Sequence, residues 1–250
     1  MSLRPLWIAG RLLTRLPFPD PGEASPTDTG HSVPWYPVVG LILGILVAAA
    51  GIGLAQTEPG VAAALVLILW VWSSGGIHLD GLGDSADAWV GGLGSRERTL
   101  AIMKDPRCGP AAVSAIVLVL IAKWAGIQAL MTDGQPWLLL FMPLLGRTQL
   151  SLLLLTTPYA REQGMAGDQS RHLQRRTAWF ATLTSALACL LATGWVGLIL
   201  LIVAVTIFVL ARRSMLERIA GFTGDTAGAL VEITETLALL TCVLVTFSAD

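Results

Sequence analysis

Charged residues are scarce in this chain. Asp, Glu, Lys and Arg together make up 13% of its 250 residues, whereas hydrophobic residues make up 54%. An ordinary soluble domain contains about 25% charged residues. A soluble fold of this length could not bury so much apolar surface, so we expect lipid to be the solvent for much of the chain.

Other scarcities narrow the class of protein further. The formal net charge is −1, so the composition gives no reason to expect binding to nucleic acid. The three cysteines, Cys108, Cys189 and Cys242, are scattered, which argues against a disulfide framework. There is also no CxxC or Cys/His spacing of the kind that binds metals. We find no internal repeat and no linker between domains, so we expect a single transmembrane domain over residues 1–250.

The N-terminal segment lacks the uninterrupted apolar core of a signal peptide, because Arg4, Arg11 and Arg15 divide it. These arginines recur at i, i+7 and i+11, on one face of a helix, and the leucines of the segment fall largely elsewhere. We therefore expect an amphipathic helix within residues 1–20 that lies on the membrane surface. An ordinary surface helix would give the same pattern.

Seven segments approach the length of about 20 apolar residues that a helix needs to cross the hydrocarbon core. The stretch 178–211 contains no charge and is too long for one span, so we divide it at Thr193-Gly194. The predicted fold class is all-α, a polytopic integral membrane protein with about seven transmembrane helices and an N-terminal interfacial helix. The expected spans are residues 36–55, 61–77, 111–131, 137–157, 178–193, 195–211 and 229–247.

The distribution of basic residues predicts an orientation. The N-terminal segment and the loops 78–110, 158–177 and 212–228 hold fourteen of the sixteen Lys and Arg residues. Cytoplasmic loops are enriched in these residues. We therefore expect the N-terminus in the cytoplasm and, with an odd number of spans, Asp250 on the opposite side.

Residues 75–89, GGIHLDGLGDSADAW, place an acidic motif directly after one of the most apolar runs. Asp80, Asp84 and Asp87 are spaced i, i+4 and i+7, so they share one face of a helix. Carboxylates this close repel one another unless a cation lies between them, and oxygen ligands suit Mg²⁺. We therefore predict a Mg²⁺ site; a solvated acidic helix face is the simpler alternative. Gly81 would let a ligand approach the backbone closely.

His78 lies in the same motif, but in helical register it points away from the three aspartates. It could serve as a general base, a metal ligand or an interfacial cap residue, and its position alone does not choose among these roles.

A second acidic group occurs in RIAGFTGDTAGALVEITETLALL, residues 218–240. Asp225 and Glu232 are seven residues apart and share a helical face with Gly228 nearby, and Glu235 follows Glu232 by one turn. A carboxylate at membrane depth is costly and usually functional. We therefore regard this group as part of a site, with a shallow position in the headgroup zone as the alternative.

Basic side chains that could pair with anions follow the acidic motif or lie within spans. Arg96, Arg98 and Lys104 follow the motif, whereas Arg147 and Lys123 lie inside predicted spans. A buried arginine needs an anionic partner, from the protein or from a ligand. The inventory suits metal-assisted phosphoryl transfer, although a divalent-cation or proton-coupled transporter could use the same residues.

The motif GGIHLDGLGDSADAW, followed by RERTLAIMKDPRCGP, resembles the signature of the cobalamin synthases, the adenosylcobinamide-GDP ribazoletransferase family. The segments LLTRLPFP, WYPVVGLILG and GFTGDTAGALVEITE match that family in the same order. The resemblance extends from about residue 8 to residue 240. Leu79 departs from the family pattern, because relatives often carry an acidic residue there, and this leaves one fewer potential metal ligand.

The resemblance implies a Mg²⁺-dependent enzyme of the bacterial cytoplasmic (inner) membrane, with its active site on the cytoplasmic face. It implies that the enzyme joins adenosylcobinamide-GDP to α-ribazole or α-ribazole 5′-phosphate and releases GMP, in the last steps of vitamin B12 assembly. Asp80, Asp84 and Asp87 would then hold Mg²⁺. The expected substrate- and phosphate-binding residues are Arg96, Lys104, Arg147, Gly81 and Gly228, and the expected catalytic residues are His78, Asp225 and Glu232.

The same residues allow two rival functions, and the assignment implies several partners. Short and nearly uncharged outer loops count against a divalent-cation transporter, and the MKDPR and TGDTAGA segments count against a CDP-alcohol-type phosphotransferase. The lipid bilayer is an expected partner and nucleic acid is not. A homo-oligomer, or an association with other cobalamin-assembly enzymes, is compatible with this assignment.

Overall fold

The computed structural model describes residues 3–161 and 164–247, and this part of the chain is built from helices. No β-strand occurs within these ranges beyond an isolated bridge between Tyr159 and Phe222, so the predicted all-α class is confirmed. The elements are α1 (Arg4–Leu13), α2 (Pro26–Ser32), η1 (Val33–Trp35), α3 (Tyr36–Gly53), α4 (Pro59–Ser74), α5 (Ile77–Gly91), α6 (Arg96–Ile102), α7 (Pro110–Thr132), η2 (Pro136–Leu140), α8 (Phe141–Thr156), α9 (Met165–Arg171), α10 (Arg175–Thr193), α11 (Trp195–Ile219) and α12 (Gly224–Phe247).

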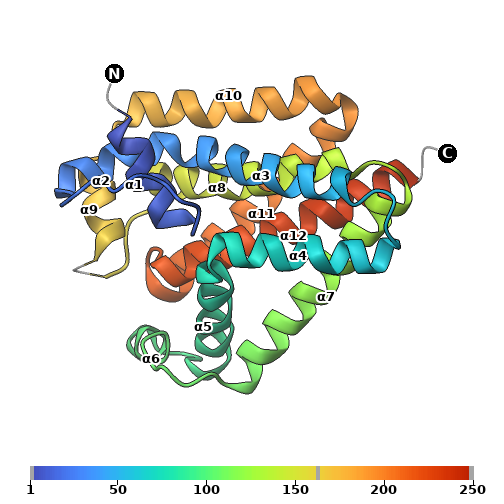
Figure 1. The fold of residues 1–250 in the computed structure, drawn as a ribbon. Helices are drawn as coiled ribbons and strands as arrows, with labels where there is room; N and C mark the ends of the chain where they lie inside the picture. Colours follow the sequence, from blue (N-terminus) through green and yellow to red (C-terminus); the bar gives the residue numbers. More distant parts are fainter. Residues whose placement is uncertain (1–2, 162–163, 248–250) are drawn as a thin grey trace.

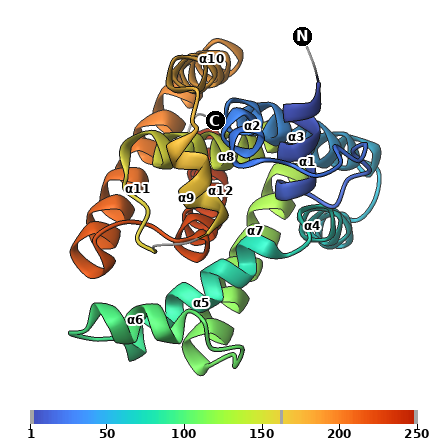
Figure 2. The same ribbon diagram turned by 90° about the vertical axis from the view of Figure 1, so that its left-hand side faces the viewer.

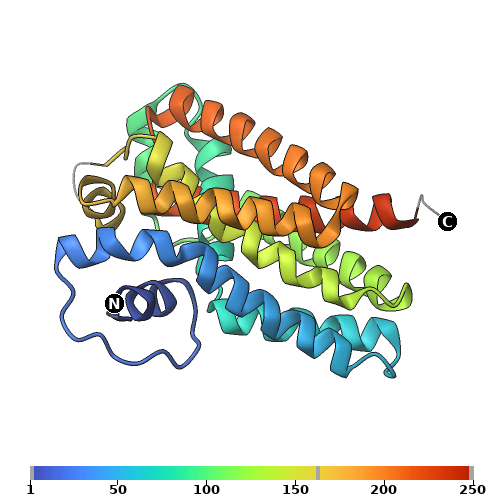
Figure 3. The same ribbon diagram turned by 90° about the horizontal axis from the view of Figure 1, so that it is seen from above.

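The long helices lie side by side, as Figures 1 and 3 show for α3, α8, α10 and α12. Large apolar side chains on the outer faces are exposed, among them Ile68, Leu118, Phe180 and Leu210. Such a surface is unfavourable in water and favourable in lipid. The structure therefore supports a multi-pass membrane protein.

Five stretches among the described residues are long and apolar enough to cross a membrane, and a sixth crossing appears when α4 and α5 are counted together. The predicted number of seven is therefore not confirmed. The missing span is α10, which lies alongside the other long helices in Figure 1. Its sequence, RRTAWFATLTSALACLLAT, begins with two arginines and is interspersed with Thr and Ser, which lowers its hydropathy.

A pair of glycines separates α4 from α5. Gly75 and Gly76 both have left-handed backbone conformations, with φ of 70° and 67°. A residue without a Cβ adopts these angles at no steric cost. The chain bends there by 86°, so the predicted span 61–77 ends at Ser74. We treat α4 as the spanning part and α5, which runs at a steep angle to the long helices (Figures 1 and 2), as lying outside the spans.

The N-terminal segment forms a helix, as predicted. The apolar side of α1 packs on the bundle, where Ala9 and Leu13 join a buried cluster that includes Tyr36. This packing is what either an interfacial or an ordinary surface helix would show, so the position of α1 on the membrane stays a prediction.

The basic segments gather at one end of the molecule. Figure 1 shows three of them, in α1, around α9 and at the C-terminal end of α11, at its left-hand side, and the fourth, around α6, below them. Of the two ends of the bundle, this is the one expected to face the cytoplasm. The predicted location of Asp250 falls outside the described residues.

Candidate acidic site between α5 and α12

The two acidic groups predicted from the sequence meet where α5 packs against α12. Glycines allow the close approach of the two helices. A Cβ on Gly81 would lie 2.6 Å from the backbone oxygen of Asp225, and one on Gly228 would lie 3.2 Å from Cα of His78. Gly81 and Gly228 thus serve helix packing, and their predicted contact with phosphate stays a prediction.

Four carboxylates surround this junction. Asp80 is exposed, and Asp84, Asp87 and Asp225 are partly buried. Burial, together with the charges of Asp80, Asp225 and Asp87, raises the pKa of Asp84 to about 6, and Arg161 offsets the shift in part. The negative charge at the junction therefore exceeds the positive charge that the protein places beside it.

Asp87 has a structural partner that the sequence pattern did not reveal. Its two carboxylate oxygens accept hydrogen bonds from the backbone N–H groups of Gly109, at 2.5 Å, and Ala112, at 3.0 Å. These groups belong to the N-terminus of α7, where backbone N–H groups lack helical partners and the helix dipole favours an anion. Asp87 therefore caps α7 from a neighbouring helix.

Arg161 is a site residue that sequence analysis missed. Its guanidinium donates to Oδ2 of Asp225 at 2.7 Å, and both side chains are about one-fifth exposed. Arg161 follows the end of α8 in an irregular segment, where no periodicity indicates the direction of a side chain.

The chemical type of the ligand atoms at this junction, rather than their positions, indicates whether a metal ion could bind there. Within the described ranges, no three His, Cys, Asp or Glu side chains are arranged so that they could hold a metal ion. The donors are nonetheless oxygen atoms of four mutually repelling carboxylates, the ligand chemistry of Mg²⁺. We conclude that the residues fit a hard divalent cation, and the Mg²⁺ site stays a prediction.

A network of buried charges lies deeper in the bundle. Nζ of Lys123 donates to Oε2 of Glu232 at 2.7 Å and to Oε2 of Glu235 at 2.6 Å. All three side chains are 5% exposed or less. The sequence placed Lys123 near mid-span but did not identify its partner; the structure shows two. Glu232, predicted to be catalytic, is thus committed to an ion pair inside the bundle.

Arg147 joins this network from α8. It pairs with Glu235, is completely buried, and its Nη2 lies 3.3 Å from Nδ1 of His78. The structure thus supplies the anionic partner that a buried arginine requires. The predicted contact of Arg147 with phosphate stays a prediction.

The other two basic residues predicted to bind phosphate lie nearer the surface. Arg96 donates through Nε to the carbonyl of Ile219, at 3.0 Å, and through Nη2 to that of Ala160, at 2.8 Å. It thereby ties α6 to the end of α11 and to the irregular segment that contains Ala160. Lys104 is exposed just after α6.

Two cavities, each of roughly 270 Å³, adjoin the α5–α12 junction. The first, here called the His78 cavity, is lined by His78, Arg161, Tyr36 and Gln169 and by apolar side chains that include Leu153 and Phe222.

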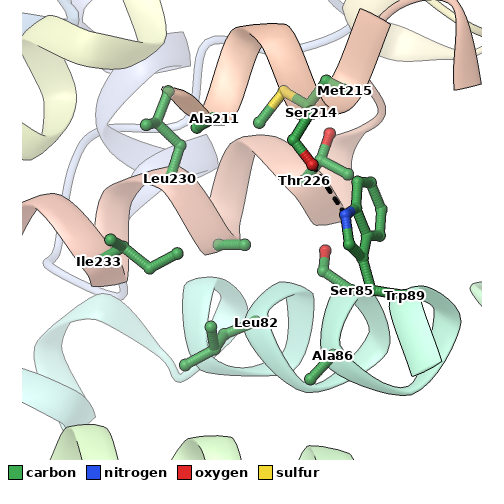
Figure 4. Close-up of a pocket in the computed structure, with 11 residues that line it drawn as sticks. Leu82, Ser85, Ala86, Trp89, Ala211, Ser214, Met215, Thr226, Leu230 and Ile233 are labelled. Atoms are coloured by element: carbon green, nitrogen blue, oxygen red, sulfur yellow. Dashed lines mark hydrogen bonds between the residues drawn. The ribbon is translucent and has the colours of Figure 1, made fainter. Parts of the chain in front are cut away.

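The second, here called the Trp89 cavity, lies between α5, α11 and α12 (Figure 4) and is almost wholly apolar. Nε1 of Trp89 donates to Oγ of Ser214 there at 2.9 Å. Oγ of Ser85 points toward α12 and has no hydrogen-bond partner in the described part of the chain.

Comparison with known proteins decides the family. The model of the cobalamin-5-phosphate synthase family matches residues 5–243. The chain belongs to this family. The resemblance found in the sequence motifs is thereby confirmed.

Relatives in the family carry a more specific name. The adenosylcobinamide-GDP ribazoletransferase of Ectopseudomonas mendocina is 50% identical over 238 residues, which cover 95% of this chain and 97% of the relative. That of Pseudomonas fluorescens is 48% identical over 236 residues, 94% of this chain and 97% of the relative. That of Pseudomonas aeruginosa PAO1 is 48% identical over 244 residues, 97% of this chain and 99% of the relative. No solved structure matches the chain.

Proposed function

We propose that this protein is an adenosylcobinamide-GDP ribazoletransferase, which joins adenosylcobinamide-GDP to α-ribazole or α-ribazole 5′-phosphate and releases GMP. The observation that carries the proposal is the convergence of the α5 aspartates and Asp225 at one end of a membrane bundle, in a chain of the cobalamin-5-phosphate synthase family. Relatives about half identical over nearly the whole chain are named for this reaction.

The reaction is a transfer of one phosphoryl centre. A ribose hydroxyl of α-ribazole forms a bond to the phosphorus that is attached to cobinamide. The bond from that phosphorus to the bridging oxygen breaks, and GMP leaves with this oxygen. The hydroxyl proton passes to a base, so the protein must position two substrates, accept one proton and offset the charge of the departing phosphate.

Asp225 is the best placed of the three predicted catalytic residues to accept the proton. Glu232 is held by Lys123 in the interior. A guanidinium has only donors, so Nδ1 of His78 accepts from Arg147 and Nε2 carries the ring proton. Asp225 is partly exposed beside the α5 aspartates, and its hydrogen bond from Arg161 fixes its orientation.

Asp80, Asp84 and Asp87 would hold the Mg²⁺ ion, with Asp87 also bound to the start of α7. When bound, Mg²⁺ supplies positive charge to the pyrophosphate oxygens and to the departing phosphate. Arg96 has two nitrogens on backbone carbonyls, which leaves Nη1 for a phosphate oxygen. Lys104 is exposed just after α6, the helix that Arg96 begins, and would contribute a second cation.

We place this site on the cytoplasmic face of the bacterial inner membrane. The N-terminal end of α12, which carries Asp225, lies at the same end of the bundle as the basic segments in α1 and around α9 (Figure 1), and cytoplasmic ends are enriched in Lys and Arg. The charges of Glu232 and Glu235 are offset by Lys123 and Arg147. This pairing counts against cation transport, for which unpaired acidic groups would have to continue through the bundle.

The proposal is tested with purified, detergent-solubilised protein, adenosylcobinamide-GDP, α-ribazole and Mg²⁺. We expect GMP and a cobalamin product in equal amounts, loss of both with EDTA, and recovery when Mg²⁺ is added in excess. Hydrolysis of adenosylcobinamide-GDP without a cobalamin product, or cation flux in proteoliposomes without release of GMP, would contradict the proposal.

A further inference from the structure

The His78 cavity is the right size for part of a substrate. Its roughly 270 Å³ is below the range of about 300–1,000 Å³ for pockets that enclose a whole drug-sized ligand. A corrinoid ring or a complete nucleotide is therefore too large for it, whereas one bicyclic ring system fits. The walls are mainly apolar, so the donors and acceptors on the edge of a guanine would be left largely unpaired.

His78 gives this apolar cavity one oriented hydrogen-bond donor. Because Nδ1 accepts from Arg147, the proton is on Nε2. Nε2 has no hydrogen-bond partner in the described part of the chain. It keeps some accessible surface, because it is not among the unpaired atoms that are fully buried there. Its N–H group is therefore available to a ligand in the cavity that His78 lines.

We propose that the His78 cavity binds the 5,6-dimethylbenzimidazole base of α-ribazole, with Nε2–H of His78 donating to the free ring nitrogen. This inference rests on the proposed function and adds a specificity-determining residue to it. The base is flat, carries two methyl groups, and has one unsubstituted ring nitrogen as its only acceptor. A mainly apolar cavity, with the N–H donor of His78 on its wall, complements those features.

The position of the cavity agrees with the reaction. Arg161, which donates to Asp225, lines it, as do Gly224 and Gly228 at the start of α12. A base in the cavity therefore places the attached ribose at the α5–α12 junction. Ribose hydroxyls then come near Asp225, where one of them is to lose its proton.

The Trp89 cavity has an equal volume but the wrong position. Its α5 residues Leu82, Ser85 and Trp89 continue the helical face of His78 toward the C-terminal end of α5. Neither His78 nor Arg161 is among its lining residues. Figure 4 shows Trp89 and Ser85 directed toward α11 and α12. A base bound there would therefore lie beside neither the Nε2–H group of His78 nor the Arg161–Asp225 pair.

The test compares α-ribazole with the α-riboside of 5,6-dimethylindole, in which a C–H group replaces the free ring nitrogen. With adenosylcobinamide-GDP saturating and GMP release measured, we expect the wild type to show a KM about 5–10-fold lower for α-ribazole, the loss typical of one hydrogen bond. His78→Leu should raise the KM for α-ribazole by a similar factor, so that the two nucleosides have equal KM values. His78→Gln, which keeps an N–H donor, should retain part of it.

Two alanines on α12 provide a matched control for the position of the base. Ala227 lines the His78 cavity, Ala229 lines the Trp89 cavity, and both are buried. Each residue changed to Val fills one cavity with the same two methyl groups. We expect Ala227→Val to raise the KM for α-ribazole several-fold and Ala229→Val to leave it unchanged, with the KM for adenosylcobinamide-GDP constant in both.

The outcomes separate this inference from the function on which it rests. A wild type that releases no GMP from the two substrates overturns both. A wild type that turns over with equal KM values for the two nucleosides overturns the base site alone. The same holds if the Ala229 variant, and not the Ala227 variant, raises the KM for α-ribazole.

Discussion

The buried charges between α7, α8 and α12 lead to a prediction about thermal stability. The predicted effect depends on which residues pair, and not on net charge alone. Lys123 is the only ion-pair partner of Glu232 among the described residues, whereas Glu235 also pairs with Arg147. Lys123→Met therefore leaves Glu232 buried without a cation. Breaking a buried ion pair in this way costs about 3–5 kcal/mol. For a chain of this size, that loss lowers Tm by about 6–20 °C.

Two double variants distinguish this pairing from the net charge of the network. Lys123→Met with Glu232→Gln removes both members of one pair, so we expect most of the lost stability to return. Lys123→Met with Glu235→Gln restores the same net charge but separates Glu232 and Arg147 from their partners. We expect this variant to be at least as unstable as Lys123→Met alone.

Thermal unfolding in one detergent, followed by circular dichroism, measures the difference. The unfolding temperatures of the wild type, the single variant and the two double variants are compared at the same protein-to-detergent ratio. Equal recovery in both double variants would refute the reasoning, because it would show that net charge alone determines the stability.

Three further predictions concern the acidic site and the orientation of the chain. Asp87→Ala should cost about 1–2 kcal/mol in thermal unfolding with EDTA, because it uncaps α7, whereas Asp84→Ala should cost nothing; equal losses would contradict the cap. Because the pKa of Asp84 is raised to about 6, its contribution to metal-free stability is present below its unfolded pKa of 3.8 and is lost as the pH rises through about 6. Mg²⁺ should therefore raise Tm at pH 7 but far less at pH 5, where protons compete with the metal. An equal effect at both pH values would argue against a metal at Asp84. Cys108, the only exposed thiol in the described part of the chain, should react with an impermeant maleimide in inside-out vesicles and not in intact cells, whereas Asp133→Cys in a Cys108→Ser background should do the reverse; labelling of both from one side would contradict the orientation.

Sequence patterns predicted the position of a residue on its own helix better than its contacts with residues of other helices. The spacing of Asp80, Asp84 and Asp87 gave their shared helical face, and the depth of Glu232 within the last span agreed with its burial. Spacing along one helix does not say which neighbouring helix faces it. The cap that Asp87 forms on α7 and the ion pair of Lys123 with Glu232 therefore emerged only from the structure.

Two other differences have local causes. The bend between α4 and α5 depends on two successive left-handed glycines, and the letters Gly75-Gly76 permit that conformation without requiring it. Arg161 lies in an irregular segment between α8 and α9, where the 3.6-residue periodicity that predicts a shared face does not apply. Its pairing with Asp225 could not be read from the sequence for that reason.

The central claim, that the α5 aspartates form the active site of a ribazoletransferase, is tested most directly by GMP release from Asp84→Asn. Asp20→Asn is the matched control, because it removes the same charge from an exposed side chain whose only ion-pair partner in the described part of the chain is Arg11. With adenosylcobinamide-GDP, α-ribazole and ordinary Mg²⁺, we expect the control to match the wild type. Asp84→Asn should be slower by about 100-fold or more, the loss typical when one charge-stabilising group leaves an active site. Wild-type turnover in Asp84→Asn, with the protein folded, would contradict the account.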